Sequence, residues 1–303
     1  MRECKSRLMV GWSVLATTVV MTSVLTLLGY VMVTGAAALG PTLLVGDAPL
    51  WPALTGQVPV WDGIWPACVG TLTVVLLSLL LALLPGIATG VWMATAADGR
   101  LSRCLGVAVD VLAGVPSILM GLFGFTLILF LRQWYFPAAN TSLLLAAACL
   151  AMLIVPYLAV STRTALQSLP PQLRQTALSL GMTESQACRH VLLPQACGGI
   201  MAGILLAIGR AAEDTAVIML TGAVVNAGLP GGLLQRFEAL PFSIFYLSAQ
   251  YQSQQELTMA FGAALTLMLL TATLFAMAGA LQRAASRRRW GRLNQEVSHD
   301  RPD

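Results

Sequence analysis

Charged residues are scarce in this chain of 303 residues: they make up 10% of it, whereas a soluble domain carries about 25%. Hydrophobic residues make up 57% of the sequence. A soluble fold of this length has no interior large enough for so much apolar surface, so the lipid bilayer is the expected solvent. A membrane-spanning helix needs about 20 mostly apolar residues. Seven stretches contain no charged residue: 8–46, 63–97, 111–131, 133–162, 190–209, 215–235 and 257–282.

The residues that carry most enzyme chemistry are also missing. Lysine occurs once, at Lys5, and no Gly-x-x-x-x-Gly-Lys loop surrounds it, so the chain lacks the usual ATP-binding motif. Neither His-Glu-x-x-His nor Gly-x-Ser-x-Gly occurs, and the histidines are only His190 and His299. We therefore expect no catalytic residue, no metal and no cofactor on this chain. The six cysteines form no Cys-x-x-Cys pair, and we interpret them as small buried hydrophobic residues: Cys4, Cys68, Cys104, Cys149, Cys188 and Cys197.

The uncharged stretches predict an all-α membrane protein that forms one transmembrane domain, 1–303, with about six spanning helices. The first apolar stretch is far longer than the roughly 7–15 residues of a signal peptide, so we interpret it as a retained helix. Two segments rich in proline, glycine or tryptophan, 41–65 and 226–256, are expected to be loops between spans. The spans are predicted at 8–36, 66–96, 104–131, 142–163, 194–225 and 258–282.

Basic residues predict the orientation of the chain in the membrane. With the N-terminus, 97–103, 163–193 and the C-terminal tail on one side, fourteen basic residues lie there and two on the other, Arg132 and Arg236. The fourteen are Arg2, Lys5, Arg7, Arg100, Arg103, Arg163, Arg174, Arg189, Arg283, Arg287, Arg288, Arg289, Arg292 and Arg301. The positive-inside rule then places both termini in the cytoplasm and the loops 41–65 and 226–256 in the periplasm. Basic residues placed beside apolar stretches disfavour a nucleic-acid partner.

The polar segment 164–193 is long enough to fold on the cytoplasmic side. A short helix is predicted from Pro171 to a stop at Gly181. A second helix follows, capped by Thr183, and Pro194 begins the next span. Such a hairpin with an apolar stripe is suited to docking into a groove of a partner protein. Three apolar residues of the first helix are expected to share that stripe: Leu173, Ala177 and Leu180.

This segment resembles the EAA loop of bacterial ABC-importer permeases, EAA-x3-G-x9-I-x-LP. Gln175-Thr176-Ala177 stands in the place of EAA, and Gly181 is the glycine. Val191 stands in the place of isoleucine, and Leu193-Pro194 is the final pair. The resemblance implies an ABC type I importer permease fold, in which this coupling-helix hairpin fits a cleft on a separate ATPase. That ATPase would bind the ATP and magnesium.

Three further stretches resemble phosphate-importer permeases: 63–72, 113–124 and 209–216. The first and second favour the PstA type. The resemblance covers about 60–285. The third stretch departs from Gly-Arg-Ala-x-Gly-Glu-Thr-Ala, because Glu213 replaces the glycine and Asp214 the glutamate. The resemblance implies a bacterial inner-membrane permease that forms half of a phosphate translocation path. The implied partners are a second permease of the PstC type, two copies of an ATPase of the PstB type and a periplasmic phosphate-binding protein.

Arg210 is the candidate for contact with the transported anion. It lies about 24 Å along a helix from Pro194, inside a predicted span, where an unpaired charge is costly. Glu213 and Asp214, at i+3 and i+4, can share its face of the helix. The planar fork of a guanidinium suits an oxyanion, although a buried ion cluster that only fixes helix packing would show the same residues. The proposed path consists of Arg210, Glu213, Asp214, Thr215 and Ser117.

Other functions stay open on the sequence alone. A permease of the same class can serve another oxyanion or another solute. A secondary transporter would usually show inverted repeats and ionisable residues in several spans, whereas the intramembrane charge here is concentrated in one. A membrane scaffold without transport would not need the spacing of the EAA loop.

Overall fold

The computed structural model describes residues 2–95 and 99–299, with side chains for 9–95, 99–280, 282 and 283. Part of the predicted 97–103 turn therefore lies outside the described residues. The terminal basic residues that support the predicted orientation lie outside the described side chains, together with Cys4 and His299. Those basic residues are Arg2, Lys5, Arg7, Arg287, Arg288, Arg289, Arg292 and Arg301.

The described part of the chain is helical and contains no strand, apart from an isolated bridge between Ala223 and Phe237. The six long apolar helices are α1 (Arg2–Ala38), α4 (Trp65–Thr95), α6 (Ser117–Trp134), α7 (Leu143–Gln167), α10 (Leu193–Glu213) and α13 (Gln254–His299). The others are α2 (Pro41–Val45), α3 (Leu50–Leu54), α5 (Arg100–Gly114), α8 (Pro171–Ser179), α9 (Glu184–Ala187), η1 (Cys188–Leu192), α11 (Ala216–Thr221) and α12 (Leu240–Gln250). The expected all-α fold with about six spans is confirmed.

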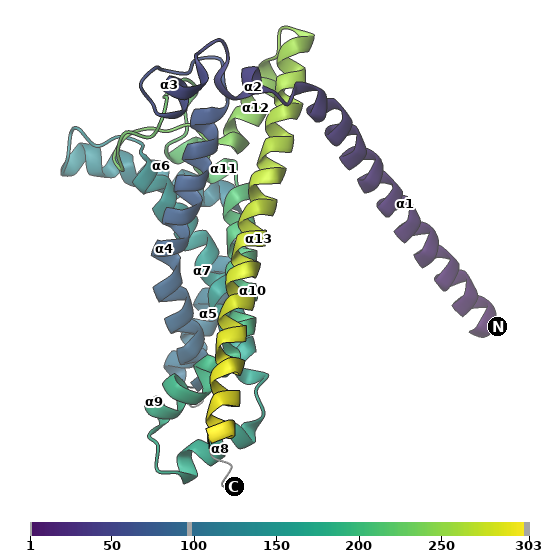
Figure 1. The fold of residues 1–303 in the computed structure, drawn as a ribbon, viewed down its shortest axis with the longest axis vertical. Coiled ribbons are helices and arrows are strands. Elements are labelled where there is room, and N and C mark those ends of the chain that lie inside the picture. The colour runs from purple at the N-terminus through teal and green to yellow at the C-terminus, as the bar shows by residue number, and fades with distance from the viewer. Residues whose placement is uncertain (1, 96–98, 300–303) are drawn as a thin grey trace.

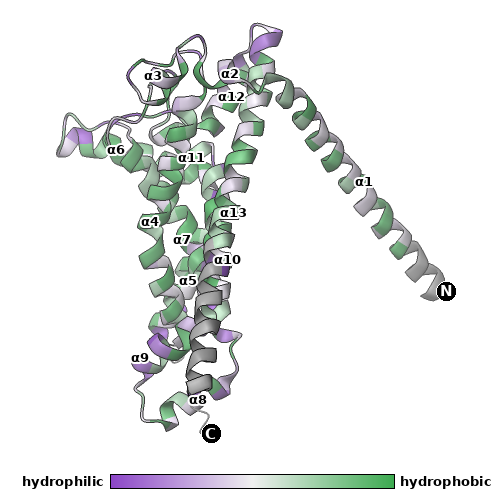
Figure 2. Ribbon diagram, viewed as in Figure 1, coloured by the Kyte–Doolittle hydropathy of each residue, from purple (hydrophilic) through white to green (hydrophobic). Residues whose placement is uncertain are grey.

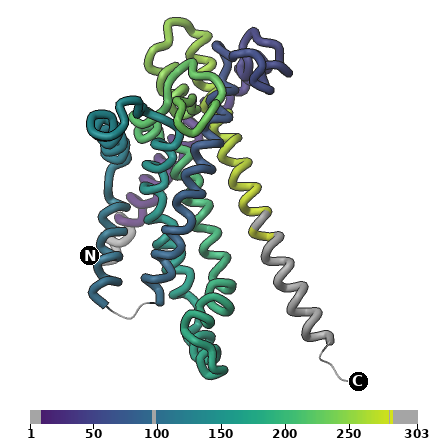
Figure 3. Tube along the Cα trace, turned by 90° about the vertical axis from the view of Figure 1, so that its left-hand side faces the viewer, coloured from purple at the N-terminus to yellow at the C-terminus, as the bar shows by residue number. Residues whose placement is uncertain are grey.

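Four helices, α4, α7, α10 and α13, run side by side along the long axis of the molecule (Figure 1). The α8–α9 hairpin lies at one end of this bundle, which we call the hairpin end, and α2, α3 and α12 lie at the other, the loop end. Helix α1 leaves the bundle from the loop end and slants away from it. Figure 3 shows that the hairpin-end portions of α4 and α5 lie close to each other, to one side of the hairpin.

Hydrophobic residues occupy the middle of the bundle, and hydrophilic residues gather at its two ends (Figure 2). Helix α1 is apolar but almost entirely exposed along its described length. It touches the bundle near its end, where Tyr30 packs edge-on against Phe261 with ring centroids 5.4 Å apart. An apolar helix with so little protein around it is suited to contact with lipid or with another membrane subunit.

Two of the predicted spans are broken, which corrects the sequence prediction. The span expected at 104–131 consists of α5 and α6, because Val115 is extended (φ −70°, ψ 125°) before Pro116. Proline disfavours helical backbone in the residue before it. Helix α6 consequently lies across the bundle rather than along it (Figure 1). The span expected at 194–225 ends at Glu213, since Asp214 is also extended (φ −77°, ψ 113°).

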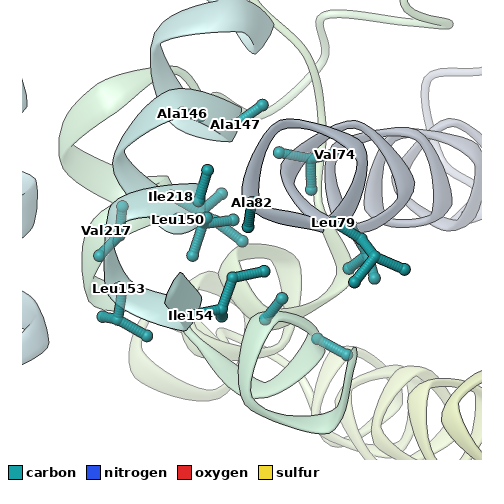
Figure 4. Close-up of a cluster of buried hydrophobic side chains, with 14 of the residues drawn as sticks. Val74, Leu79, Ala82, Ala146, Ala147, Leu150, Leu153, Ile154, Val217 and Ile218 are labelled. Atoms are coloured by element: carbon teal, nitrogen blue, oxygen red, sulfur yellow. The ribbon is translucent and has the colours of Figure 1, made fainter. Parts of the chain in front are cut away.

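The core forms where α4 and α7 pack against each other with α10 and α11 beside them. Its buried side chains come from all of these helices, and Val74, Leu79, Leu150, Ile154 and Ile218 are among those shown in Figure 4. Small residues let the helices approach closely, as the Gly-x-x-x-Gly spacing indicates.

Two glycines of α4 lie directly against α7. A Cβ atom at Gly86 would lie 2.6 Å from the Cβ of Leu158, and one at Gly90 would lie 2.5 Å from the carbonyl oxygen of Ala159. The second Gly-x-x-x-Gly pair, Gly199 and Gly203, meets the same helix at Ala165 and Ser161. Both pairs therefore mark close contacts between helices.

Replacing Gly90 by leucine should separate α4 from α7. The added side chain meets backbone of α7 rather than a flexible side chain, so we expect about 1–3 kcal/mol of destabilisation from overpacking. The free energy of unfolding in a detergent titration measures the loss. Gly29→Leu on α1 is the matched control, because no atom lies within 4 Å of the Cβ position there. Equal stability of the two variants would contradict this account of the core.

The predicted loop 226–256 is not a simple surface loop. Its first part is an irregular run of bends and turns that is tied to the start of α7. The N–H groups of Leu143 and Leu144 donate to the carbonyl oxygens of Gln235 and Leu233, at 2.9 and 2.8 Å. Phe237 is fully buried, and α12 follows it. The bonds satisfy N–H groups at the start of α7 that have no partner within their own helix.

Candidate functional site

The hairpin has the turn that its sequence predicts. Pro170 and Pro171 begin α8, and α9 is capped by Thr183, whose side chain accepts from the N–H of Gln186 while the Gln186 side chain accepts from the N–H of Thr183. Between the helices Gly181 has a positive φ of 83°. Glycine adopts this left-handed conformation without the steric cost that a Cβ atom brings. The prediction of Gly181 as a turn glycine is confirmed.

An ion pair connects the two arms of the hairpin. The Nε and Nη2 atoms of Arg174 on α8 donate to the two carboxylate oxygens of Glu184 on α9, at 3.0 and 2.8 Å. Both side chains are exposed, so the pair contributes little to stability. Its two-point geometry nevertheless links one side chain of each arm directly.

The apolar residues of the hairpin do not form one exposed stripe, which corrects the sequence prediction. Ala177 is 3% exposed and faces into the hairpin, and Leu173 is half-buried against a cluster around Leu192 and Ala196. Leu180 alone of the three is open, with 76% of its surface exposed. Of the predicted stripe, a partner can therefore reach Leu180 only, together with exposed neighbours on α8 that include Gln175, Thr176 and Leu178.

The remaining motif residues join the hairpin to the membrane domain. Val191, Leu193 and Pro194 are half-buried where α9 passes through η1 into α10. This junction is a single π-helical turn, in which the N–H of Leu193 bonds to the carbonyl of Cys188 five residues earlier. Glu184–Glu213 is consequently one apolar helix of 30 residues, about 45 Å long. One continuous helix therefore joins the hairpin to the far end of α10.

Arg210 lies in the last turn of α10 and forms an ion pair with Asp214. Its Nη2 atom is 3.1 Å from Asp214 Oδ2, and the Asp214 side chain is 1% exposed whereas that of Arg210 is 31% exposed. The other carboxylate oxygen of Asp214 accepts from the N–H of Val217 at 2.8 Å, at the start of α11. One acid thus ends α10, begins α11 and neutralises Arg210.

Only one of the two predicted acids is paired with Arg210. Glu213 is exposed and forms no ion pair within the described part of the chain. Thr215 is half-buried and follows Asp214 in the break. The arginine therefore keeps an open face with a single carboxylate beside it.

Ser117 lies at the second helix break, at the start of α6. Four residues further on, about 6 Å along that helix, a Cβ atom at Gly121 would lie 2.9 Å from the carbonyl oxygen of Ala216. The two breaks are therefore neighbours in space. Arg210, Asp214 and Thr215 are together at one of them, and half-buried Ser117 is at the other.

A buried acid at the loop end was missed by the sequence analysis. Glu238 is 6% exposed, and its carboxylate accepts from the N–H of Gly228 at 2.8 Å. Burial raises its pKa, and the N–H groups of Gly228 and Ala227 oppose that rise. The sequence did offer a sign of this buried acid, because Glu238 is the only acid in 215–255 and has apolar neighbours. Within the described residues, no three His, Cys, Asp or Glu side chains gather as a metal site.

Solved transporter structures share this fold. The chain superposes on a subunit of the MetNI methionine ABC transporter in an inward-facing conformation with a TM-score of 0.55 and 20% identity, covering 77% of this chain and 96% of that one. A bacterial ABC transporter for the import of the acidic polysaccharide alginate gives a TM-score of 0.55 at 14% identity, over 72% of this chain and 78% of that one. The type I importer permease fold expected from the EAA spacing is thereby supported.

Curated relatives extend over most of the sequence. The chain is 32% identical to phosphate transport system permease protein PstA 1 of Mycobacterium tuberculosis, over 75% of this chain and 73% of that protein. It is 30% identical to PstA of Xylella fastidiosa, over 77% and 79%, and 27% identical to PstC 1 of Mycobacterium tuberculosis, over 60% and 60%. The protein-family model named binding-protein-dependent transport system inner membrane component matches residues 86–288 of this chain. This chain therefore belongs to the family of binding-protein-dependent transport system inner membrane components and is of the PstA type.

Proposed function

We propose that this chain is the permease subunit of an ATP-driven phosphate importer and forms half of its translocation path. The observation that carries the proposal is the single helix that joins the hairpin to the partly exposed Arg210. The similarity to permeases named for phosphate transport supports phosphate as the substrate. The chain itself carries no ATP-binding motif, so hydrolysis belongs to two copies of a partner ATPase.

In this mechanism the ATPase holds the hairpin through its exposed face, around Gln175, Thr176 and Leu180. ATP binding and hydrolysis move the hairpin, and the helix Glu184–Glu213 carries that movement to the break at Asp214. A phosphate delivered by a periplasmic binding protein passes Arg210, whose guanidinium forms charge-assisted hydrogen bonds to it. Asp214 neutralises the arginine between visits, so the contact is weak and release is fast.

A second permease completes the path. Exposed apolar surface on α1 and α5 is available to that subunit or to lipid. The hairpin end lies in the cytoplasm in this proposal, so both termini are cytoplasmic and the loop end faces the periplasm of the bacterial inner membrane.

Uptake of radiolabelled phosphate tests the proposed function. Cells that lack this chain should lose the uptake, and the chain supplied in trans should restore it. Unlabelled sulfate in excess should leave the restored uptake unchanged, while unlabelled phosphate should abolish it. Restored uptake that sulfate suppresses equally would assign the permease to oxyanions in general, and no restoration would refute the phosphate proposal.

The proposed orientation has its own test in cysteine labelling of intact cells. Single cysteines at Trp51, Phe136 and Leu234, which are 79%, 66% and 75% exposed at the loop end, should react with an impermeant maleimide. A cysteine at Leu180, 76% exposed, should react only after the membrane is opened. Labelling of Leu180→Cys in intact cells would place the hairpin outside and exclude its docking to an ATPase.

A further inference from the structure

A cavity of about 290 Å³ lies between the hairpin-end portions of α4, α5 and α7. It is separate from the proposed path, because Arg210 and Asp214 are not among its lining residues. It is also separate from the hairpin, which contributes no residue to it. Its polar side chains come from two helices: Ser102, Arg103 and Asp110 on α5, and Arg163 on α7.

The cavity is built by one face of α5. Arg103, Gly106, Val107 and Asp110 recur at i, i+3, i+4 and i+7, so they share a face of the helix. That face is held against the bundle by Val109, which packs with Met93 of α4 and Ala159 of α7. Gly106 has no side chain to fill the space, and the nearest atom to its Cβ position is the Met93 methyl carbon at 3.8 Å. The space is therefore a consequence of the packing of three helices.

Two arginines in this cavity have no acidic partner. Arg103 and Arg163 lie 60 positions apart in the sequence, and neither forms an ion pair with any residue that the structure describes. Asp110 lines the same cavity, seven residues after Arg103 and so about 10 Å further along α5. The lining therefore carries two positive charges toward the end of the bundle and one negative charge deeper in.

We propose that this cavity binds a phosphate group through Arg103 and Arg163. Two guanidinium groups supply planar sets of donors that match phosphate oxygens, and the Ser102 hydroxyl adds one more donor. The volume corresponds to about ten water molecules at roughly 30 Å³ each, enough for one phosphate with part of its hydration. Asp110 repels the anion and so confines it to the arginine side. The phosphate belongs either to the headgroup of an anionic lipid or to free inorganic phosphate.

The test measures binding of both sources to the purified, complete transporter without ATP, so that it does not depend on import. One probe is radiolabelled inorganic phosphate in equilibrium dialysis. The other is the phosphatidylglycerol retained after reconstitution into vesicles of phosphatidylglycerol and phosphatidylcholine. Arg210→Gln, measured in parallel, identifies any phosphate held at the proposed path.

The double variant Arg103→Gln/Arg163→Gln removes both arginines and their charge-assisted hydrogen bonds. It should weaken binding of whichever probe occupies the cavity, inorganic phosphate or phosphatidylglycerol, at least about tenfold. Asp110→Asn should strengthen binding of the same probe severalfold, because it removes the repelling carboxylate. A general loss of folding could only weaken that binding. Arg100→Gln is the matched control: this arginine is exposed on the same helix but does not line the cavity. Because both arginines are exposed and unpaired within the described chain, the double variant should keep the thermal midpoint of the unmodified protein.

Phosphatidylglycerol retention that depends on both arginines identifies a lipid site, and phosphate binding that depends on them identifies a site for the free anion. The proposal is overturned if the unmodified transporter binds neither probe beyond what Arg210→Gln removes. It is equally overturned if the double variant and Arg100→Gln bind both probes alike.

Discussion

Gly181→Val should leave the protein in the membrane and abolish most of its transport. Residue 181 has a φ of 83°, where a residue with a Cβ atom costs about 1–2 kcal/mol, and a β-branched residue is among the least tolerated. Since the Cβ position at Gly181 has no atom within 4 Å, the effect is conformational and not steric. The turn should open, and binding of the ATPase should weaken about 5- to 30-fold.

Three measurements on the same membranes separate the causes. The amount of inserted protein should be unchanged, because insertion depends on the apolar spans. Co-purification with the ATPase and phosphate uptake should both fall. Gly181→Asn is the control, because asparagine tolerates the left-handed conformation. This variant should retain most of the ATPase co-purification and most of the phosphate uptake. A valine variant that keeps the ATPase and its uptake would show that the hairpin does not couple ATP hydrolysis to transport.

Arg210→Gln should reduce phosphate uptake by roughly tenfold to a hundredfold. It removes the guanidinium that we place on the path, and it leaves Asp214, 1% exposed, without its counter-charge. Breaking a fully buried pair costs about 3–5 kcal/mol, and the cost here should be smaller because the arginine is about a third exposed. Some loss of assembled protein is therefore expected together with the loss of transport.

The double variant Arg210→Gln/Asp214→Asn separates packing from transport. Asparagine keeps a side-chain oxygen for the N–H of Val217 and removes the unpaired charge, so assembly and ATPase activity should recover. Uptake per assembled transporter should stay low if Arg210 contacts the anion. Recovery of uptake in the double variant would make Arg210 a packing ion. Glu213→Gln is the control on the same turn. Because that acid is exposed and unpaired among the described residues, we expect no loss of assembly or of phosphate uptake.

The parts of the fold that the sequence predicted correctly are those that one local physical signal determines. Uncharged stretches of span length identified the six apolar helices, and the Pro171, Gly181 and Thr183 signals identified the hairpin. Both depend on local chemistry, namely the cost of burying charge in lipid and the backbone preferences of proline, glycine and threonine.

The breaks inside the spans were missed because hydropathy does not depend on backbone conformation. Pro116 and Asp214 lie in apolar surroundings that suit a continuous helix, whereas Pro85 and Pro156 sit inside unbroken helices of the same chain. Proline by itself therefore does not decide the outcome, which depends on the packing of neighbouring helices. The burial of the Ala177 side chain inside the hairpin also depends on tertiary contacts, as does the cavity at Arg103 and Arg163. No local sequence pattern therefore predicted either of them.

The π-helical turn at Cys188–Leu192 has a consequence for how this chain tolerates change in length. A π turn accommodates one more residue than an α turn, and one residue corresponds to about 100° of rotation around a helix. Deleting a single residue here would let the turn become α-helical and leave the far end facing the same neighbours, because the π turn already contains the extra residue. Deleting a residue within α10 instead would rotate the hairpin by about 100° relative to Arg210 and Asp214. Insertions and deletions of one residue should therefore be rare within α10 among functional relatives, and more frequent at the π turn that precedes it.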